Sequence, residues 1–167
     1  APEIAVSLSH EIGRMGLLER ENAATLNASL IEVAHRTISG IRSALSTLGI
    51  DAPLYFSQND GTLMDAEFAS RYPVLTMASG PTNSMRGAAF LSGVQDGIVV
   101  DVGGTSTDVG ALVSGFPREA SVVVEIAGVR TNFRIPDVVS VALGGGSIVR
   151  RDPLRIGPDS VAFRLKS

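Results

Sequence analysis

The stretch Asp101-Val102-Gly103-Gly104-Thr105-Ser106-Thr107-Asp108 decides the fold that we expect for this chain. The mainly apolar segments 98–101 and 109–113 stand before and after the two glycines. They predict the two strands of a hairpin whose turn holds these glycines. Glycine adopts backbone conformations closed to other residues, and without a Cβ it lets main-chain N–H groups approach phosphate oxygens. The stretch therefore predicts a phosphate-binding turn.

The side chains of this turn suit a nucleotide as well. Thr105, Ser106 and Thr107 supply hydroxyl donors. Asp101 and Asp108 would repel a phosphate directly, so we expect them to hold Mg²⁺, usually through water, or to orient an attacking water or hydroxyl. The alternative is a Gly-Gly hairpin with a polar turn, but a hairpin alone requires neither two acids nor three consecutive hydroxyls.

A second glycine-rich turn, Leu143-Gly144-Gly145-Gly146-Ser147, follows the apolar segment 137–142. Three glycines after a strand would let a flat ligand lie against the backbone. We expect a helix to begin near Ser147 and to present free N–H groups to that ligand. A flexible strand-to-helix turn without a ligand is the alternative.

A third polar cluster, Gln58-Asn59-Asp60-Gly61, follows the apolar segment 53–57, which we interpret as a short buried strand. Polar residues at the end of a strand commonly face a ligand in α/β folds, so Asn59 and Asp60 are candidate substrate residues. The alternative is an Asx turn that caps the next helix, which we place from Thr62 to Ser70. A further helix is predicted to begin at Ser79-Gly80-Pro81.

The two halves of the chain differ in their periodicity. Apolar residues at three- and four-residue steps predict one long helix over about residues 17–48, with Gly49 as its stop. After Gly97 the pattern changes to strands, with a second hairpin from 121–126 and 129–135 and two short strand-like pieces in 155–165. This order of elements fits an α/β or α+β layered domain, and we expect a single α/β domain, mainly helical over 1–96 and strand-rich over 97–167.

Composition excludes several kinds of chemistry. The 167 residues are 44% hydrophobic and 19% charged, which describes a globular chain. The absence of cysteine removes disulfides and thiolate chemistry, and Lys166, the only lysine, does not stand beside a glycine loop as a P-loop requires. The net charge of −3 gives no indication of nucleic acid, and no apolar run approaches a membrane span of about 20 residues.

Taken in order, these residues resemble the hydantoinase A/oxoprolinase family. The matching pieces, which cover nearly the whole chain, are Ser9 to Gly13, Leu18 to Ala23 with Leu26-Asn27-Ala28, Ser57 to Gly61, Pro73-Val74, Ser79-Gly80-Pro81, Asp101 to Val109, Ala142 to Ser147 and Gly157-Pro158-Asp159-Ser160. The turn after Asp101 and the Gly-Gly-Gly-Ser turn are the most specific of these matches.

The resemblance implies an actin-like ATPase (ribonuclease H-like) lobe with a mixed sheet and helices, in a cytoplasmic enzyme that uses ATP and Mg²⁺. Family members open cyclic amide rings (hydantoins, 5-oxoproline) with ATP hydrolysis, and relatives contribute to ATP-dependent carboxylation of ketones. Phosphorylation of the ring carbonyl oxygen would make its carbon electrophilic toward water. The resemblance assigns Mg²⁺ or water to Asp101 and Asp108, the phosphates to Gly103, Gly104, Thr105, Ser106 and Thr107, and the adenosine side to Gly144, Gly145, Gly146 and Ser147.

The resemblance also implies that partners complete the site. Actin-like ATPases clamp nucleotide between two lobes that each carry a phosphate turn, and this chain contains one such turn. We expect a missing N-terminal lobe, a missing C-terminal portion and a second hydantoinase subunit as partners, with no nucleic acid and no membrane. The chain alone is then expected to bind ATP weakly without turning over substrate. Two alternatives stay open: a portion of an ATP-dependent ketone carboxylase subunit, and a non-catalytic actin-like nucleotide-binding module.

Overall fold

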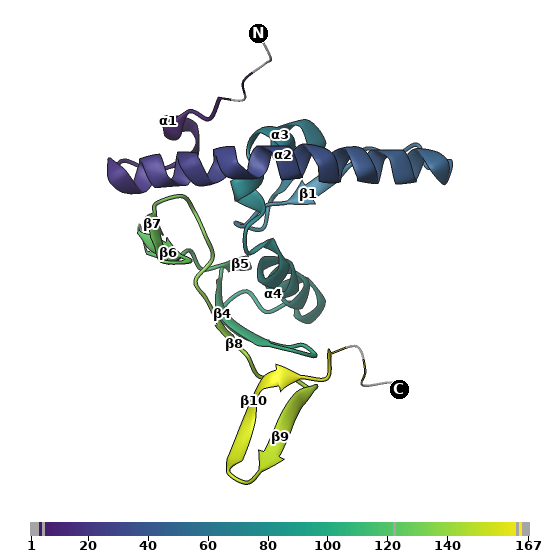
Figure 1. Ribbon diagram of the computed structural model, residues 1–167, viewed down its shortest axis with the longest axis vertical. Coiled ribbons are helices and arrows are strands. Elements are labelled where there is room, and N and C mark those ends of the chain that lie inside the picture. The colour runs from purple at the N-terminus through teal and green to yellow at the C-terminus, as the bar shows by residue number, and fades with distance from the viewer. Residues whose placement is uncertain (1–3, 5, 122, 163, 165–167) are drawn as a thin grey trace. The chain divides into compact units, whose positions relative to one another are not determined.

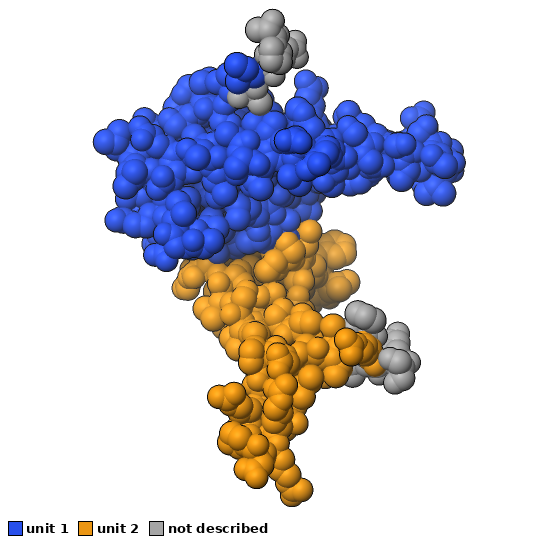
Figure 2. All heavy atoms as spheres, in the orientation of Figure 1, with its two compact units in different colours: residues 1–79, 119–136 blue, residues 80–118, 137–167 orange. Residues whose placement is uncertain are grey.

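The computed structural model describes residues 4, 6–121, 123–162 and 164 (Figure 1). It divides into two compact units (Figure 2). Unit 1 consists of residues 1–79 and 119–136, and unit 2 of residues 80–118 and 137–167. Residues 119–136 thus return to the helical unit, whereas the sequence suggested one change of structure at residue 97. Val122, Leu165 and Lys166, which entered the sequence predictions, lie outside the described residues.

Unit 1 is organised along one long helix. The elements are α1 (Ser9–Ile12), α2 (Leu18–Thr47), β1 (Tyr55–Ser57), β2 (Leu63–Asp65), α3 (Ala66–Arg71), the 3₁₀ helix η1 (Pro73–Thr76), β6 (Val124–Ile126) and β7 (Val129–Thr131). The predicted long helix and the second hairpin are confirmed. The chain leaves α2 through Gly49, whose φ of 69° is easily reached only by glycine. Figure 1 shows α2 running the length of this unit.

The core of unit 1 lies on one face of α2. Ala23 packs there with Ile12, Tyr72, Val74 and Phe133, which come from three other segments of the chain. Asn27 is fully buried beside this cluster and has its polar atoms satisfied: its Nδ2 donates to Arg71 O (3.0 Å) and Ser7 Oγ (2.9 Å), and its Oδ1 accepts from Val74 N (3.2 Å). The buried amide therefore has hydrogen-bond partners for its polar atoms, and these bonds join three segments of the chain.

The helix predicted from Thr62 begins later than expected. Residues 63–65 form β2, which pairs antiparallel with the partly exposed β1, and α3 starts only at Ala66. Asp60 explains the difference, because its Oδ1 accepts from Thr62 N (2.9 Å) and Thr62 Oγ1 (2.6 Å) and so closes a turn between two strands. The helix cap is Asp65, whose Oδ1 accepts from Phe68 N at 2.7 Å.

Unit 2 contains a four-stranded antiparallel sheet, one helix and one hairpin. The elements are α4 (Ser79–Ser92, of which Ser79 belongs to unit 1), β3 (Gly97–Val102), β4 (Thr107–Val113), β5 (Phe116–Pro117), β8 (Val138–Val141), β9 (Ser147–Arg151) and β10 (Leu154–Ser160). The helix start at Ser79 and the β3–β4 hairpin are confirmed. We expected a mixed sheet, whereas every strand pairing among the described residues is antiparallel.

The helix predicted near Ser147 is wrong. That residue begins β9, which pairs with β10 and places Val149 opposite Ile156. The β-branched residues Ile148 and Val149 favour a strand, and a neighbouring strand is available to them. The predicted helix N-terminus therefore offers no N–H groups at this position.

One face of the β3–β4–β8 sheet is covered and the other is exposed. Met85 and Ala89 of α4 form a small core with Leu112, together with Val99 and Val138. The opposite face carries the exposed side chains of Ile98, Val100, Val102, Val139 and Val141. No helix in the described part of the chain is long and apolar enough to cross a membrane.

Candidate functional site

The two carboxylates of the predicted turn lie opposite each other. In the β3–β4 ladder Asp101 pairs with Asp108, one step before the turn. Residues directly opposite in antiparallel strands project to the same face, with Cβ atoms roughly 5 Å apart. Two like charges in this arrangement repel, so the pair is suited to a shared cation.

A hydroxyl and a helix lie on the same side of the sheet as these carboxylates. Ser140 of β8 is opposite Asp108, and its Oγ donates to Asp108 Oδ1. On that side Met85 lies against Gly110, while the C-terminal end of α4 lies beside Gly97 and Leu112. The covered face of the sheet therefore carries both the Asp108–Ser140 contact and the contacts with α4.

The turn itself presents a row of unpaired donors. Gly103 N donates to Ser106 O at 2.9 Å and closes the turn. The N–H groups of Gly104, Thr105 and Ser106 have no acceptor among the described residues, and Gly104 and Thr105 are exposed. Successive backbone N–H groups in a turn form a concavity that binds anions. The three donors are therefore available to phosphate oxygens.

The second glycine turn lies directly against the first one. Gly145 N donates to Gly103 O at 2.9 Å, and Gly146 N donates to Gly104 O at 2.8 Å. The other two N–H groups of this turn are also engaged, Gly144 N with Ser147 Oγ (2.8 Å) and Ser147 N with Gly144 O (3.0 Å). The Gly144 turn therefore supports the turn of residues 103–106, and none of its four N–H groups from Gly144 to Ser147 is free for a ligand.

Close approach explains why residue 144 is glycine. A Cβ built there would lie 2.6 Å from Gly103 O and 2.8 Å from both Gly104 C and Thr105 N. All three atoms belong to the backbone and cannot move aside cheaply. Neither Gly103 nor Gly104 has a positive φ, so the turn does not use the left-handed backbone conformation that we expected of its glycines.

The remaining predicted residues have defined partners. Thr107 Oγ1 donates to Leu143 O at 2.6 Å and links the two turns, so its proton is already engaged. In unit 1, buried Asn59 donates through Nδ2 to Arg134 O (2.5 Å), and half-buried Asp60 closes the turn described above. These bonds give both residues a structural function, and their contact with substrate stays a prediction.

Sequence reasoning missed two serines of this site. Ser140 is the one polar residue of an apolar strand, which was a visible signal, but its pairing with Asp108 depends on strand register. Ser160 Oγ donates to Gly104 O at 3.2 Å, from the far strand of the β9–β10 hairpin. Neither contact is local in sequence, so spacing alone could not identify them.

The residues at the turn have the chemistry that a magnesium ion requires, and its binding there stays a prediction. Mg²⁺ commonly binds one or two protein carboxylates and completes its shell with water and phosphate oxygens. Asp101 and Asp108 supply two facing carboxylates beside the turn of residues 103–106, and neither forms a salt bridge within the described residues. No group of three acidic, histidine or cysteine side chains that could hold a metal occurs in this part of the chain. A metal here would therefore depend on the phosphates for further ligands.

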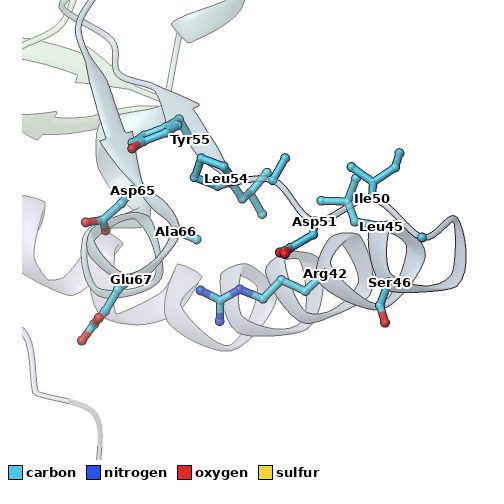
Figure 3. A pocket seen from close by; sticks show the side chains of 13 residues that line it. Arg42, Leu45, Ser46, Ile50, Asp51, Leu54, Tyr55, Asp65, Ala66 and Glu67 are labelled. Carbon is cyan, nitrogen blue, oxygen red and sulfur yellow. The ribbon is translucent and has the colours of Figure 1, made fainter.

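Unit 1 has a separate pocket of about 750 Å³ at the C-terminal end of α2 (Figure 3). Arg42, Asp51, Asp65 and Glu67 supply its charged groups, and Leu45, Ile50 and Leu54 supply its apolar surface. None of the residues predicted from sequence to bind nucleotide or substrate lines it. The pocket is a surface feature for which the described residues indicate no ligand.

With the two turns placed, the family can be stated. The hydantoinase/oxoprolinase family matches residues 20–166. The chain belongs to this family. The match includes both glycine turns, the facing carboxylates and Ser160.

Family relatives include subunits of two kinds of enzyme. The chain is 28% identical over 166 residues to the caprolactamase subunit alpha of Pseudomonas jessenii, covering 95% of this chain and 24% of that protein. It is 29% identical over 167 residues to the acetophenone carboxylase gamma subunit of Aromatoleum aromaticum, covering 94% and 22%. The crystal structure of the ATP-dependent caprolactamase from Pseudomonas jessenii superimposes with a TM-score of 0.72 at 26% identity, over 95% of this chain and 24% of that one. The chain thus spans about a quarter of each relative.

Proposed function

We propose that this chain is the phosphate-binding portion of an ATP-dependent enzyme that opens cyclic amide rings, and that its fold is one lobe of an actin-like ATPase. The observation that carries the proposal is the row of unpaired N–H groups at Gly104, Thr105 and Ser106, next to the facing carboxylates Asp101 and Asp108. Membership of the hydantoinase/oxoprolinase family and likeness to an ATP-dependent caprolactamase support the same assignment.

In this proposal the residues at the turn bind the phosphates and the metal ion, and Ser140 orients one of the carboxylates. The N–H groups of residues 104–106 and the hydroxyls of Thr105 and Ser106 bind phosphate oxygens. Asp101 and Asp108 would hold Mg²⁺ directly or through water, and the ion would neutralise phosphate charge. Ser140 Oγ, bonded to Asp108 Oδ1, fixes the direction of that carboxylate. The Gly144 to Ser147 turn lies beneath this site, and we place the adenosine side of the nucleotide near it.

The amide substrate and the partners are part of the proposal. Phosphorylation of a ring carbonyl oxygen transfers the γ-phosphoryl group to that oxygen and releases ADP. The carbon then accepts water, the C–N bond breaks and phosphate leaves. We expect a cyclic amide substrate, a second phosphate-bearing lobe and a partner subunit in a cytoplasmic enzyme, because one turn contacts only one side of a nucleotide.

A titration tests the phosphate site. Mg-ATP is added to the chain while backbone amide resonances are followed by NMR. Weak, saturable shifts confined first to Gly104, Thr105 and Ser106 are expected. If saturable shifts appear elsewhere while these three amides stay unmoved, or if no amide moves at millimolar nucleotide, the site is wrong.

A second function is favoured by the acetophenone carboxylase relative. In that case the phosphate turn would serve an ATP-dependent ketone carboxylase. Phosphate release from Mg-ATP by the complete enzyme separates the two, with hydantoin, 5-oxoproline or caprolactam in one arm and a ketone with bicarbonate in the other. Stimulation only in the bicarbonate arm would replace the amide hydrolase by the carboxylase. Product formation that Asp108→Ala leaves unchanged would favour a nucleotide-binding module without chemistry.

A further inference from the structure

The strand β10 ends against the phosphate turn. Its last residue, Ser160, is opposite Ser147 in the β9–β10 ladder, and both serines contact a glycine turn. Ser147 Oγ accepts from Gly144 N (2.8 Å), and Ser160 Oγ donates to Gly104 O (3.2 Å). The neighbouring Val161 N donates to Gly146 O at 2.9 Å. The end of β10 is therefore bonded to both turns at once.

Gly104 O accepts two hydrogen bonds. One comes from Gly146 N at 2.8 Å and the other from the Ser160 hydroxyl at 3.2 Å. This carbonyl belongs to the same peptide group as the Thr105 N–H, which has no acceptor among the described residues. Donors on the carbonyl side of a peptide group polarise it and make its N–H a better donor. Ser160 thus acts on Thr105 N–H through a shared peptide plane.

We propose that Ser160 is a positioning residue for phosphate binding, which orients and polarises the Gly104–Thr105 peptide group from behind. The inference rests on the proposed function, because it assigns Ser160 to the same phosphate site. Ser160 itself does not face the ligand side of this peptide, since it bonds the carbonyl oxygen, and so it works through Thr105. The Gly157-Pro158-Asp159-Ser160 stretch thereby gains a function that its sequence alone did not indicate.

The test compares three serine variants of the full chain. Ser160→Ala removes the hydroxyl, and Ser160→Thr retains it. Ser92→Ala is the matched control in the same unit, because Ser92 Oγ also donates to a backbone carbonyl (Ala88 O, 2.6 Å) and accepts an N–H two residues later (Val94 N, 3.1 Å). Ser160 Oγ accepts in the same way from Ala162 N at 3.0 Å.

Mg-ADP is titrated into each variant, and amide resonances and melting temperatures are recorded. Ser160→Ala is expected to weaken Mg-ADP binding roughly three- to tenfold, the effect of one hydrogen bond, while Ser160→Thr stays within about twofold of the unsubstituted chain. Ser92→Ala should bind as the unsubstituted chain does, with a melting temperature close to that of Ser160→Ala. Unchanged affinity in Ser160→Ala, or an equal loss in Ser92→Ala, overturns the inference.

Spectra of the variants without nucleotide test the Ser160 contact even if the proposed function is wrong. If the unsubstituted chain binds no Mg-ADP, the nucleotide assignment is lost, but the Thr105 amide resonance still reports on the peptide group. A shift of that resonance in Ser160→Ala, absent in Ser92→Ala and Ser160→Thr, would show that Ser160 still positions the Gly104–Thr105 peptide group. A Thr105 resonance that does not respond to Ser160→Ala overturns it.

Discussion

The N–H of Gly146 donates a hydrogen bond to the carbonyl oxygen of Gly104 at 2.8 Å, and this bond joins two glycine turns that are distant in sequence. A parallel bond from Gly145 N to Gly103 O lies beside it at 2.9 Å. The carbonyl acceptors face the second turn, while the N–H groups of residues 104–106 have no partner among the described residues. One turn therefore organises the other, and the free donors remain available to an anion.

The contact between the turns leaves no room for a side chain at residue 144. Gly144→Ala is expected to destabilise the chain by about 1–3 kcal/mol, because the new Cβ meets three backbone atoms at 2.6–2.8 Å. Gly145→Ala is the control, since its nearest atom would be 3.9 Å away. Urea unfolding measures both. Equal stability of the two variants would contradict the close approach.

The facing carboxylates predict opposite effects on stability and on binding. Asp108→Asn removes the repulsion with Asp101, so the free chain should gain up to about 1 kcal/mol of stability. The same variant should bind Mg-ATP roughly tenfold or more weakly, because a charged ligand is lost. Calorimetry at matched ionic strength measures affinity, and thermal unfolding measures stability.

Asp159→Asn controls for net charge in that experiment. Asp159 is an exposed residue of the same unit and pairs with Arg150 at 2.6 Å. An exposed ion pair contributes little, so affinity for Mg-ATP should stay within about twofold. An equal loss of affinity in both variants would show that the overall charge, and not the position of Asp108, governs binding.

Glu11 predicts an acid-dependent stability in unit 1. The hydrogen bond from Tyr72 Oη (2.5 Å) is the largest cause that lowers the pKa of Glu11 below 4.5, and Arg71 adds to it. A carboxyl with a lowered pKa stabilises the fold above its unfolded pKa and loses that contribution as the pH falls through the folded pKa. Tyr72→Phe should therefore flatten the loss of stability below about pH 4.5.

Tyr55→Phe provides the comparison for the acid titration, because Tyr55 is an exposed tyrosine of the same unit with no hydrogen bond to a carboxylate among the described residues. The free energy of unfolding is measured by urea denaturation at several pH values from neutral to acid. The slope should change for Tyr72→Phe and stay the same for Tyr55→Phe. Identical slopes for all three chains would show that the Tyr72 bond does not shift Glu11.

The buried amide of Asn27 predicts a large loss of stability on truncation. Asn27→Ala leaves Val74 N and Arg71 O without their partner, and each unsatisfied group costs about 1–3 kcal/mol. Asn22→Ala, on the same helix, removes a single bond to Arg130 O (2.9 Å) and should cost at most about 1.5 kcal/mol. Urea unfolding of both variants checks the order, and a larger effect at residue 22 would contradict it.

Several elements were predictable because their signals are local. The long helix follows from apolar residues at helical spacing, and its observed bounds, Leu18–Thr47, lie within one residue of the prediction. The β3–β4 hairpin follows from two apolar segments around a Gly-Gly turn. By contrast, the start of α3 depended on an Asp60–Thr62 contact, and a strand replaced the helix expected at Ser147 because β10 was available to pair with it.

The sequence by itself determined that a turn with two glycines, three hydroxyls and two flanking acids stands between two strands, and such a turn suits a phosphate. Only the tertiary structure decided how that turn is supported. Hydrogen bonds from Gly145, Gly146 and Ser160 reach it from segments far along the chain, and two of the three are backbone donors with no side-chain signature. These bonds engage the N–H groups of Gly145 and Gly146, which are therefore lost to a ligand, whereas the N–H groups of residues 104–106 have no acceptor among the described residues.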